Sequence, residues 1–152
     1  MTATYRQATP ADTSDLVRFQ MDMARETEDV ELDSQVLTLG VLAVFDDASR
    51  GQYYVAERDD RVVGSTLITY EWSDWRNGTV WWIQSVHVVP EARRQGVYGG
   101  LSAYLKQLAE SDERVRGIRL YVDLRNTRAQ LVYARLGMNG EHYQVFEWMK
   151  SF

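Results

Sequence analysis

The sequence predicts a single α/β domain with a mixed sheet, and two observations point to this class. The first is length, because 152 residues suffice for one hydrophobic core and are too few for two. The second is the order of the apolar patterns, which switch between periods of two and 3.6 to give β-α-α-β-β-β-α-β-α-β. We therefore expect one domain over residues 1–152, without a linker or an internal repeat.

The first part of the chain predicts a short strand and two helices. Residues 5–8 form the strand candidate, and Pro10 then introduces a helix whose apolar residues recur at helical spacing. The second helix begins at a cap formed by Asp33 or Ser34 and continues through Phe45. The link between the two helices is acidic, with Glu26, Glu28, Asp29, Glu31 and Asp33.

The middle of the chain is rich in strand-forming residues. Residues 52–58 and 61–70 predict a hairpin, because two aspartates join them as a short turn. Residues 81–89 are nearly continuous in aromatic and β-branched side chains and end at Pro90, which predicts a central strand. We expect the nearby tryptophans mostly in the core or at a dimer face, with one or two lining an acceptor pocket: Trp72, Trp75, Trp81 and Trp82.

The last part of the chain alternates between helix and strand. A helical period runs from Gly96 to about Ser111, and residues 118–122 then predict a strand. A second helical period covers residues 126–136, and residues 143–149 close the chain as a final strand.

Composition and charge exclude several classes of function. The chain is 45% hydrophobic and 26% charged, with 10 Gly, 2 Pro and no Cys, which excludes disordered chains, disulfide frameworks and cysteine nucleophiles. The net charge of −5 argues against nucleic acid and anionic membranes as partners. No uncharged run approaches the ~20 residues of a membrane span, and residues 1–12 lack a signal-peptide pattern, so we expect a cytoplasmic protein.

The charge is distributed unevenly along the chain. Residues 1–60 hold 13 acidic and 5 basic side chains, a balance of −8, whereas residues 61–152 hold 9 and 12, a balance of +3. We therefore expect the two parts to meet different ligands.

The turn after the central strand carries the most informative motif. It reads Arg93-Arg94-Gln95-Gly96-Val97-Tyr98-Gly99 and leads into a helix. Backbone N–H groups and the positive end of a helix dipole then point to one spot, which suits a phosphate or pyrophosphate. Neither a Gly-Lys-Ser/Thr nor a Gly-x-Gly-x-x-Gly pattern is present, so a P-loop NTPase and a Rossmann dehydrogenase are disfavoured. The alternative is an ordinary strand-to-helix turn.

A second motif follows at residues 126–138. Asn126 and Tyr133 are seven residues apart, about two helical turns, and therefore project from the same side of a helix. Taken alone, the two residues are better explained as a helix cap, Asn126, and a core residue of an amphipathic helix, Tyr133.

Together, the two motifs resemble the GNAT superfamily of acetyl-CoA-dependent N-acetyltransferases. The turn is similar to its Arg/Gln-x-x-Gly-x-Gly/Ala signature, with Tyr98 where Gly or Ala is usual. Residues 126–138 look like its Asn-x-x-Ala-x-x-x-Tyr-x-x-x-Gly-Phe pattern, with Met138 in place of Phe. The resemblance implies a single domain with a mixed, mostly antiparallel sheet, splayed at the strand over residues 81–89 and flanked by about four helices.

The resemblance also implies acetyl-CoA as co-substrate, direct attack by an amine, and no metal. The strand segment Val86, His87 and Val88 would meet the pantetheine and the acetyl carbonyl, and Asn126 would contact the pantetheine arm. Tyr133 would protonate the departing CoA thiolate as general acid, in addition to lining the cofactor site. The pyrophosphate would lie on the turn formed by Arg93, Arg94, Gln95, Gly96, Val97, Tyr98 and Gly99.

The group that deprotonates the amine is the open point of this interpretation. Many members of the family place Glu, Asp or His where this sequence has Gln84, and an amide cannot act as a base. His87 differs from Gln84 by an odd number of positions, so on a regular strand the two side chains face opposite sides of the sheet. We therefore expect a structural role for His87.

The expected function is transfer of an acetyl group to the primary amine of a small cationic metabolite. Glu28 and Glu31 lie in the acidic link, which borders the acceptor site in this family, and would attract the cation; the alternative is a solvated loop. Two other functions stay open: a catalytically silent acyl-CoA-binding module, suggested by Gln84, and acetylation of a protein N-terminus or lysine. The family resemblance also allows a homodimer.

Overall fold

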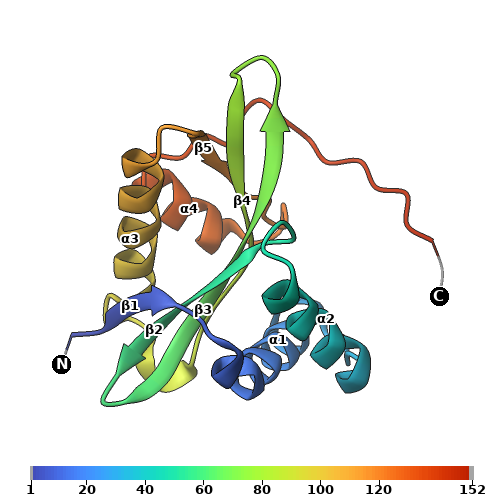
Figure 1. The fold of residues 1–152 in the computed structure, drawn as a ribbon, viewed down its shortest axis with the longest axis vertical. Coiled ribbons are helices and arrows are strands. Elements are labelled where there is room, and N and C mark those ends of the chain that lie inside the picture. The colour runs from blue at the N-terminus through green and yellow to red at the C-terminus, as the bar shows by residue number, and fades with distance from the viewer. Residues whose placement is uncertain (1, 151–152) are drawn as a thin grey trace. The chain divides into compact units, whose positions relative to one another are not determined.

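The computed structural model describes residues 2–150 and divides the chain into two compact units, Met1–Arg119 and Leu120–Phe152. Within the described residues the chain has a mixed five-stranded sheet and four α-helices (Figure 1). This confirms the predicted α/β class. No helix of the described part is long and apolar enough to cross a membrane.

The first unit contains the whole sheet. The strands follow the order β1-β2-β3-β4-β5, with the first four antiparallel and β5 parallel to β4. A parallel pair needs a crossover connection, and the third helix supplies it. The strands are β1 (Thr4–Gln7), β2 (Gln52–Arg58), β3 (Arg61–Ser73), β4 (Gly78–Val88) and β5 (Val115–Arg119).

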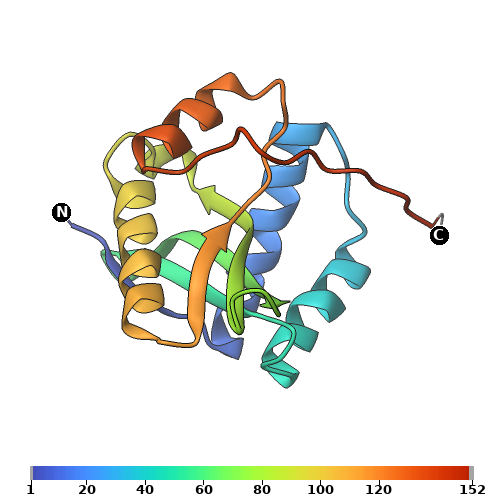
Figure 2. The same cartoon turned by 90° about the horizontal axis from the view of Figure 1, so that it is seen from above.

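Helices cover both faces of this sheet. Figure 2 shows the sheet with α1 and α2 on one side and α3 on the other. The helices are α1 (Thr13–Glu28), α2 (Ser34–Asp46), α3 (Val97–Ser111) and, in the second unit, α4 (Thr127–Arg135), with short 3-10 turns at Pro10–Asp12 and Pro90–Ala92.

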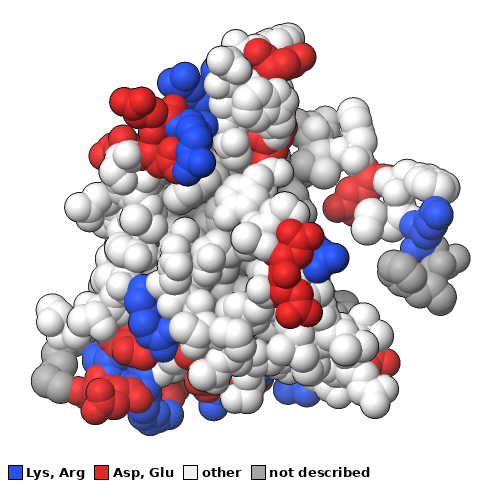
Figure 3. Space-filling model, viewed as in Figure 1, with Lys and Arg blue, Asp and Glu red and all other residues white. Residues whose placement is uncertain are grey.

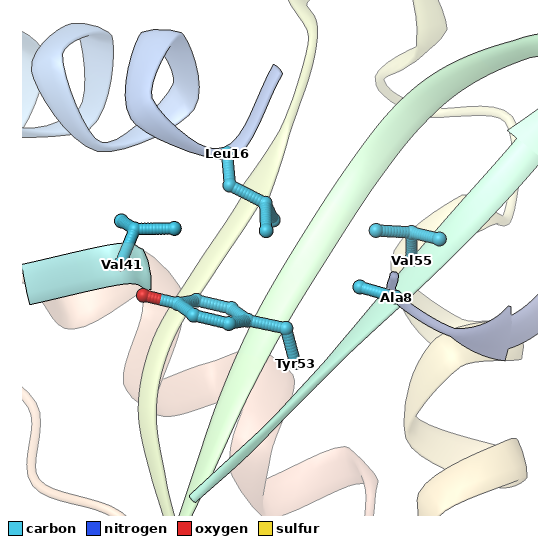
Figure 4. Close-up of a cluster of buried hydrophobic side chains, with 5 residues drawn as sticks. All are labelled: Ala8, Leu16, Val41, Tyr53 and Val55. Carbon is cyan, nitrogen blue, oxygen red and sulfur yellow. The ribbon is translucent and has the colours of Figure 1, made fainter. Parts of the chain in front are cut away.

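The core has one layer on each face of the sheet, and β2 contributes to both. Tyr53 and Val55 pack on the side of α1 and α2 (Figure 4), whereas Tyr54 packs on the side of α3. This follows from the alternation of side chains along a strand. The first layer contains Ala8, Leu16, Val41, Tyr53 and Val55, and the second Tyr54, Ile68, Trp81, Leu101 and Leu105.

Local chemistry sets the ends of several elements as predicted. Asp59 and Asp60 both have positive φ, 54° and 59°, as the tight turn of a twisted hairpin requires. Asp33 caps α2 by accepting hydrogen bonds from the amides of Gln35 and Val36 at 2.9 and 3.1 Å. Acidic and basic side chains are intermixed around the β2–β3 turn (Figure 3).

The sheet opens along β4, as the splayed arrangement predicts. β5 pairs with β4 only from Thr79 to Trp82, whereas β4 continues to Val88 against β3. The β3–β4 register also shifts by one residue, because Leu67 pairs with Ser85 and Ile68 with Ile83. Gln84 is the extra residue of a β-bulge, which bends the strand and increases its twist.

Two predicted elements differ from the structure. The strand expected over residues 118–122 lies earlier, at Val115–Arg119, where it pairs with β4. The prediction of a strand over residues 143–149 was wrong, because these residues belong to no helix or strand. An alternating apolar pattern favours a strand only where a neighbouring strand completes the ladder.

Candidate functional site

The central feature of the candidate site is the free side of β4 beyond the bulge. From Ile83 to Val88 the strand pairs with β3 and has no partner strand on its other side within the described residues. Such an edge presents backbone N–H and C=O groups to an extended ligand. Val86 and Val88, both expected to meet the pantetheine, lie on this segment.

The strand leads directly into the N-terminus of α3. Gly96 caps this helix with φ of +83°, in the left-handed region that glycine adopts at little cost. The amide of Gly100 donates to the carbonyl of Gly96 at 3.0 Å and closes the first turn. The first amides of a helix have no intrahelical acceptor, so this end of α3 suits an anion.

Two neighbouring glycines of α3 have different surroundings. A Cβ at Gly99 would meet no atom within 4 Å, so its position opens onto free space that a ligand could use. A Cβ at Gly100 would collide with the hydroxyl and ring of Tyr5 from β1. Gly100 therefore serves packing, while Gly99 leaves the surface beside the turn open.

Two polar side chains of the turn form hydrogen bonds with other parts of the protein. Arg93 donates from Nε to the Val88 carbonyl and from Nη2 to Glu26, both at 2.8 Å. Gln95 accepts from Arg58 at 2.5 Å and donates to the Glu91 carbonyl at 2.9 Å. These two residues brace the turn.

Arg94 is the unengaged cation of the turn. Its side chain is exposed and forms no hydrogen bond or ion pair with any described residue. Its backbone has φ of +62°, a conformation that costs a non-glycine residue on the order of 1 kcal/mol or more. Strain of this kind concentrates at functional sites. Among the arginines of the motif, Arg94 is therefore the best placed to meet a phosphate.

The bulge changes which side chains share a face of β4. Leu67 and Thr69 lie on the same face of β3, and Leu67 packs with the α1 and α2 layer. Gln84 donates to the Thr69 hydroxyl at 2.8 Å, so it lies on that face. Ser85 accepts from Gln20 of α1 at 3.1 Å there.

His87 lies on this same face, which corrects the expectation that it faces away from Gln84. Its ring is 5.1 Å from the ring of Phe19 in α1, centroid to centroid. The prediction assumed regular alternation, and the extra residue at the bulge reverses it.

His87 is buried, with 4% of its surface exposed. Burial lowers the pKa of its imidazole from 6.5, and the charges of Glu26 and Asp22 oppose this effect while those of Arg93 and Arg18 add to it. Within the described residues its Nε2 is buried without a hydrogen-bond partner.

The acidic link also divides into engaged and unengaged groups. Glu31 accepts from Arg25 at 2.7 Å, and this hydrogen bond lowers the pKa of the Glu31 carboxyl. Glu26 pairs with Arg93, and Asp33 caps α2. Within residues 2–150 the side-chain carboxylates of Glu28 and Asp29, at the end of α1, form no hydrogen bond or ion pair, so they are the carboxylates left for a cationic ligand.

The tryptophans near β4 occupy different environments. Trp81 is buried in the layer under α3, as expected, and Trp82 is half-buried and donates to Glu71 at 3.2 Å. Trp72 and Trp75 are 66% and 90% exposed, which excludes the core for these two, and a dimer face or an acceptor pocket stays a prediction. They lie at and beyond the end of β3, in the β3–β4 hairpin that projects past the helices of the first unit.

Asn126 and Tyr133 belong to the second unit. Asn126 is the N-cap of α4, and its Oδ1 accepts from the amide of Ala129 at 3.0 Å. Tyr133 lies two turns further along the same helix and is half-buried. Gly137 ends the helix with φ of +86°, as the sequence predicted.

Sequence reasoning missed three features of the site. The contact between Gln20 and Ser85 and the contact between Phe19 and His87 join α1 to β4, and no local pattern signals such long-range pairs. The left-handed backbone of Arg94 is also invisible in the sequence. The one signal in the sequence was Gly96, because a glycine in a turn suggests that the neighbouring backbone adopts unusual angles.

Comparison with known proteins supports this arrangement. The model of the acetyltransferase (GNAT) family matches residues 15–138. A possible acetyltransferase from Clostridium difficile 630 is 40% identical, with 100% of both chains covered and a TM-score of 0.93. A search of curated proteins found no match.

More distant solved structures share the fold alone. Aminoglycoside N-acetyltransferase AAC(6')-Iy in complex with CoA is 14% identical, covering 99% of this chain and 96% of the other, with a TM-score of 0.79. Ribosomal-protein-alanine N-acetyltransferase from Brucella melitensis biovar Abortus 2308 is 12% identical, covering 97% and 100%, with a TM-score of 0.76.

The fold and the family match define an acyltransferase. The chain belongs to the GNAT acetyltransferase family.

Proposed function

We propose that this protein transfers an acetyl group from acetyl-CoA to the primary amine of a small cationic metabolite by direct attack. The observation that carries the proposal is the continuity of the free β4 side with the N-terminus of α3. One end of this surface offers backbone groups to an extended arm, and the other offers helix amides and the cation of Arg94 to an anion.

These features fit acetyl-CoA as co-substrate, whose thioester supplies the acetyl group. The arm would lie along Val86, His87 and Val88, and the pyrophosphate would lie on residues 93–99. The open position at Gly99 leaves room for close approach to the backbone. A structure of the same fold in complex with CoA supports this assignment.

The same family resemblance assigns roles to two residues of the second unit. Asn126 would contact the pantetheine arm, and Tyr133 would donate a proton to the thiolate as the C–S bond breaks. We propose that both units act together as one N-acetyltransferase domain over residues 1–152. The family match, which runs through residues of both units, supports this view.

The acceptor is proposed from charge. Glu28 and Asp29 form no ion pairs within the described residues and lie where α1 ends, so they can attract a cation. Glu31 was expected to share this role, but its carboxylate is bound by Arg25, so any contribution from Glu31 requires that pair to open. A cytoplasmic location suits an enzyme that uses acetyl-CoA.

We also propose a homodimer. Trp72 and Trp75 leave large aromatic surfaces in water. Exposed apolar surface of this kind marks interaction sites. Light scattering after gel filtration should give twice the chain mass for the wild type, and Trp72→Ser with Trp75→Ser should shift it toward the monomer. A wild-type mass of one chain would contradict the dimer.

The test of the proposed activity is CoA release from acetyl-CoA across polyamines, amino acids, aminoglycosides and peptides. We expect amine-dependent release with small cationic amines, and a loss of about 10²-fold or more in kcat for Tyr133→Phe. Turnover on peptides alone would favour a protein acceptor. CoA binding without turnover on any amine would favour the silent binding module, and an unchanged rate in Tyr133→Phe would refute the general-acid role.

A further inference from the structure

His87 is a buried histidine whose Nε2 has no hydrogen-bond partner within residues 2–150. Buried polar atoms are nearly always paired, so an unpaired one calls for an explanation. A purely structural histidine would gain from a partner for this nitrogen, and the surrounding Phe19 ring cannot provide one. This nitrogen therefore lacks a partner among the described residues.

The bulge at Gln84 places this nitrogen on the face where the proposed mechanism lacks a base. Gln84 points to the α1 side of the sheet through its bond to Thr69. His87 lies on the same side, three residues further along the strand, beside the free segment of β4. Gln84 itself can bind and orient groups but cannot take up a proton.

Burial lowers the pKa of the His87 imidazole and so favours its neutral form near pH 7. Arg18, Asp22 and Glu26 face it from α1, and Arg93 faces it from the turn after β4. On the neighbouring strand β3, His87 pairs with Ser65, which is buried and carries no charge. The two anions raise the pKa of the imidazole and the two cations lower it, but burial has the largest effect and favours the neutral form. A neutral imidazole has a lone pair and can accept a proton.

We propose that His87 takes up, through one water molecule, the proton that the acceptor ammonium must lose before it attacks the thioester. This proposal rests on the proposed acetyltransferase activity. The ammonium N–H bond breaks and an N–H bond forms at Nε2 by relay through the water. The freed amine electron pair then bonds to the thioester carbon and the C–S bond breaks. The thiolate takes a proton from Tyr133, and the second proton that the nitrogen loses as it becomes the amide restores the Tyr133 hydroxyl. The imidazolium returns its proton to solvent.

The contact between Gln20 and Ser85 lies on the same face of β4, between Gln84 and His87 in the strand sequence. Opening or water insertion at this polar contact would give a path to an otherwise enclosed nitrogen. His87 acts through water in this scheme, so its role is tested by pH dependence and not by a drop in rate alone.

The experiment compares the pH profile of kcat/KM with the titration of His87 seen by NMR. The chain has only two histidines, so ¹⁵N-labelled imidazole signals are readily assigned, with exposed His142 as the internal control. In the wild type, kcat/KM for the best amine should fall on the acidic side with the same pKa that NMR gives for His87, below 6.5. If the pKa from the kinetic profile matches the NMR titration of His142 alone, or of neither histidine, the proposal is overturned.

Variants sharpen the comparison. His87→Gln should lower kcat/KM at pH 7 by about 10²-fold or more and remove the acidic limb. The residual kcat/KM of this variant should rise about tenfold per pH unit. The reason is that only the free amine then reacts, and its fraction grows about tenfold per pH unit below an ammonium pKa of ~10.4. His142→Gln should leave the profile unchanged. If His87→Gln keeps the acidic limb of the pH profile and its kcat/KM at pH 7 falls by less than about threefold, the assignment is overturned.

Two further outcomes are distinguishable. If His87→Gln does not fold, the wild-type match between the NMR and kinetic pKa values still decides, because it needs no variant. If the wild type turns over no amine, the proposed activity fails and the His87 role fails with it. Wild-type turnover with a mismatched pKa refutes the role of His87 only.

Discussion

Arg93 and Glu26 connect the end of β4 to the last turn of α1. The guanidinium Nη2 lies 2.8 Å from Oε2 of Glu26, and Nε of the same arginine donates to the Val88 carbonyl at 2.8 Å. The first arginine of the cofactor motif therefore holds α1 against the strand that carries the candidate site. Its role in the turn is at least partly one of support.

This contact predicts a measurable but modest coupling. Both side chains are 42% exposed, and exposed ion pairs contribute about 0.2–1 kcal/mol. Arg93→Ala should destabilise more than Glu26→Ala, because it also removes the bond to Val88. A double-mutant cycle by urea unfolding should give a coupling in this range that shrinks at high salt. A coupling that is absent at low salt would show that the contact contributes nothing.

Arg94 predicts opposite effects on stability and on ligand binding. Arg94→Gly relieves a left-handed backbone and should stabilise the protein by about 1 kcal/mol, whereas Arg94→Ala stays strained. Both variants lose the charge, and a charge-assisted hydrogen bond contributes about 1.5–3 kcal/mol. Both should therefore raise the Kd for CoA about tenfold or more, as titration calorimetry can measure. Unchanged binding in both would remove Arg94 from the anion site.

Gly99 and Gly100 provide a matched pair. Gly100→Ala should destabilise by about 1–3 kcal/mol, because its Cβ meets Tyr5 in a filled core. Gly99→Ala should be neutral or stabilising by up to about 1 kcal/mol, because its Cβ meets nothing and alanine favours a helix. If the ligand approaches the backbone here, Gly99→Ala should nonetheless weaken CoA binding. Equal thermal stability of the two variants would contradict the packing assigned to Gly100.

Burial of His87 predicts that stability depends on pH. Its pKa in the folded protein lies below 6.5, so in the acid range the unfolded chain binds the extra proton. The free energy of unfolding is therefore unaffected by the titration of His87 above pH 6.5. It falls as the pH drops from 6.5 toward the pKa of His87 in the folded protein, by at most about 1.4 kcal/mol per pH unit. Urea unfolding from pH 5 to 8 should show this slope in the wild type and in His142→Gln.

His87→Phe is the variant that tests the slope, because it keeps an aromatic ring against Phe19 and cannot titrate. The part of the acid slope due to His87 should vanish in it. The same slope in wild type and His87→Phe would mean that other groups cause the acid sensitivity.

Much of the fold could be predicted because its signals are local. The alternation in β2, the two aspartates of its turn and the Asp33 cap each depend on neighbours in the sequence. The glycine-rich turn after β4 was also predictable, since it combines a strand end, a positive-φ glycine and a helix start.

The site was less predictable because its geometry depends on pairing between strands. One extra residue at Gln84 moved His87 to the other face of the sheet, and only the register with β3 reveals it. The role of Arg93 depends on Glu26, 67 residues away. The segment over residues 143–149 had a strand pattern and no strand, because propensity alone does not supply a partner.

The most direct test of the account is a map of backbone amide shifts as CoA is titrated into ¹⁵N-labelled protein. The central claim is that the free side of β4 and the N-terminus of α3 together bind the co-substrate. The largest changes should fall on residues 83–88 and 93–99, with small changes at the Asp59–Asp60 turn, which serves as control. Saturable binding whose largest changes lie outside both segments would contradict the claim.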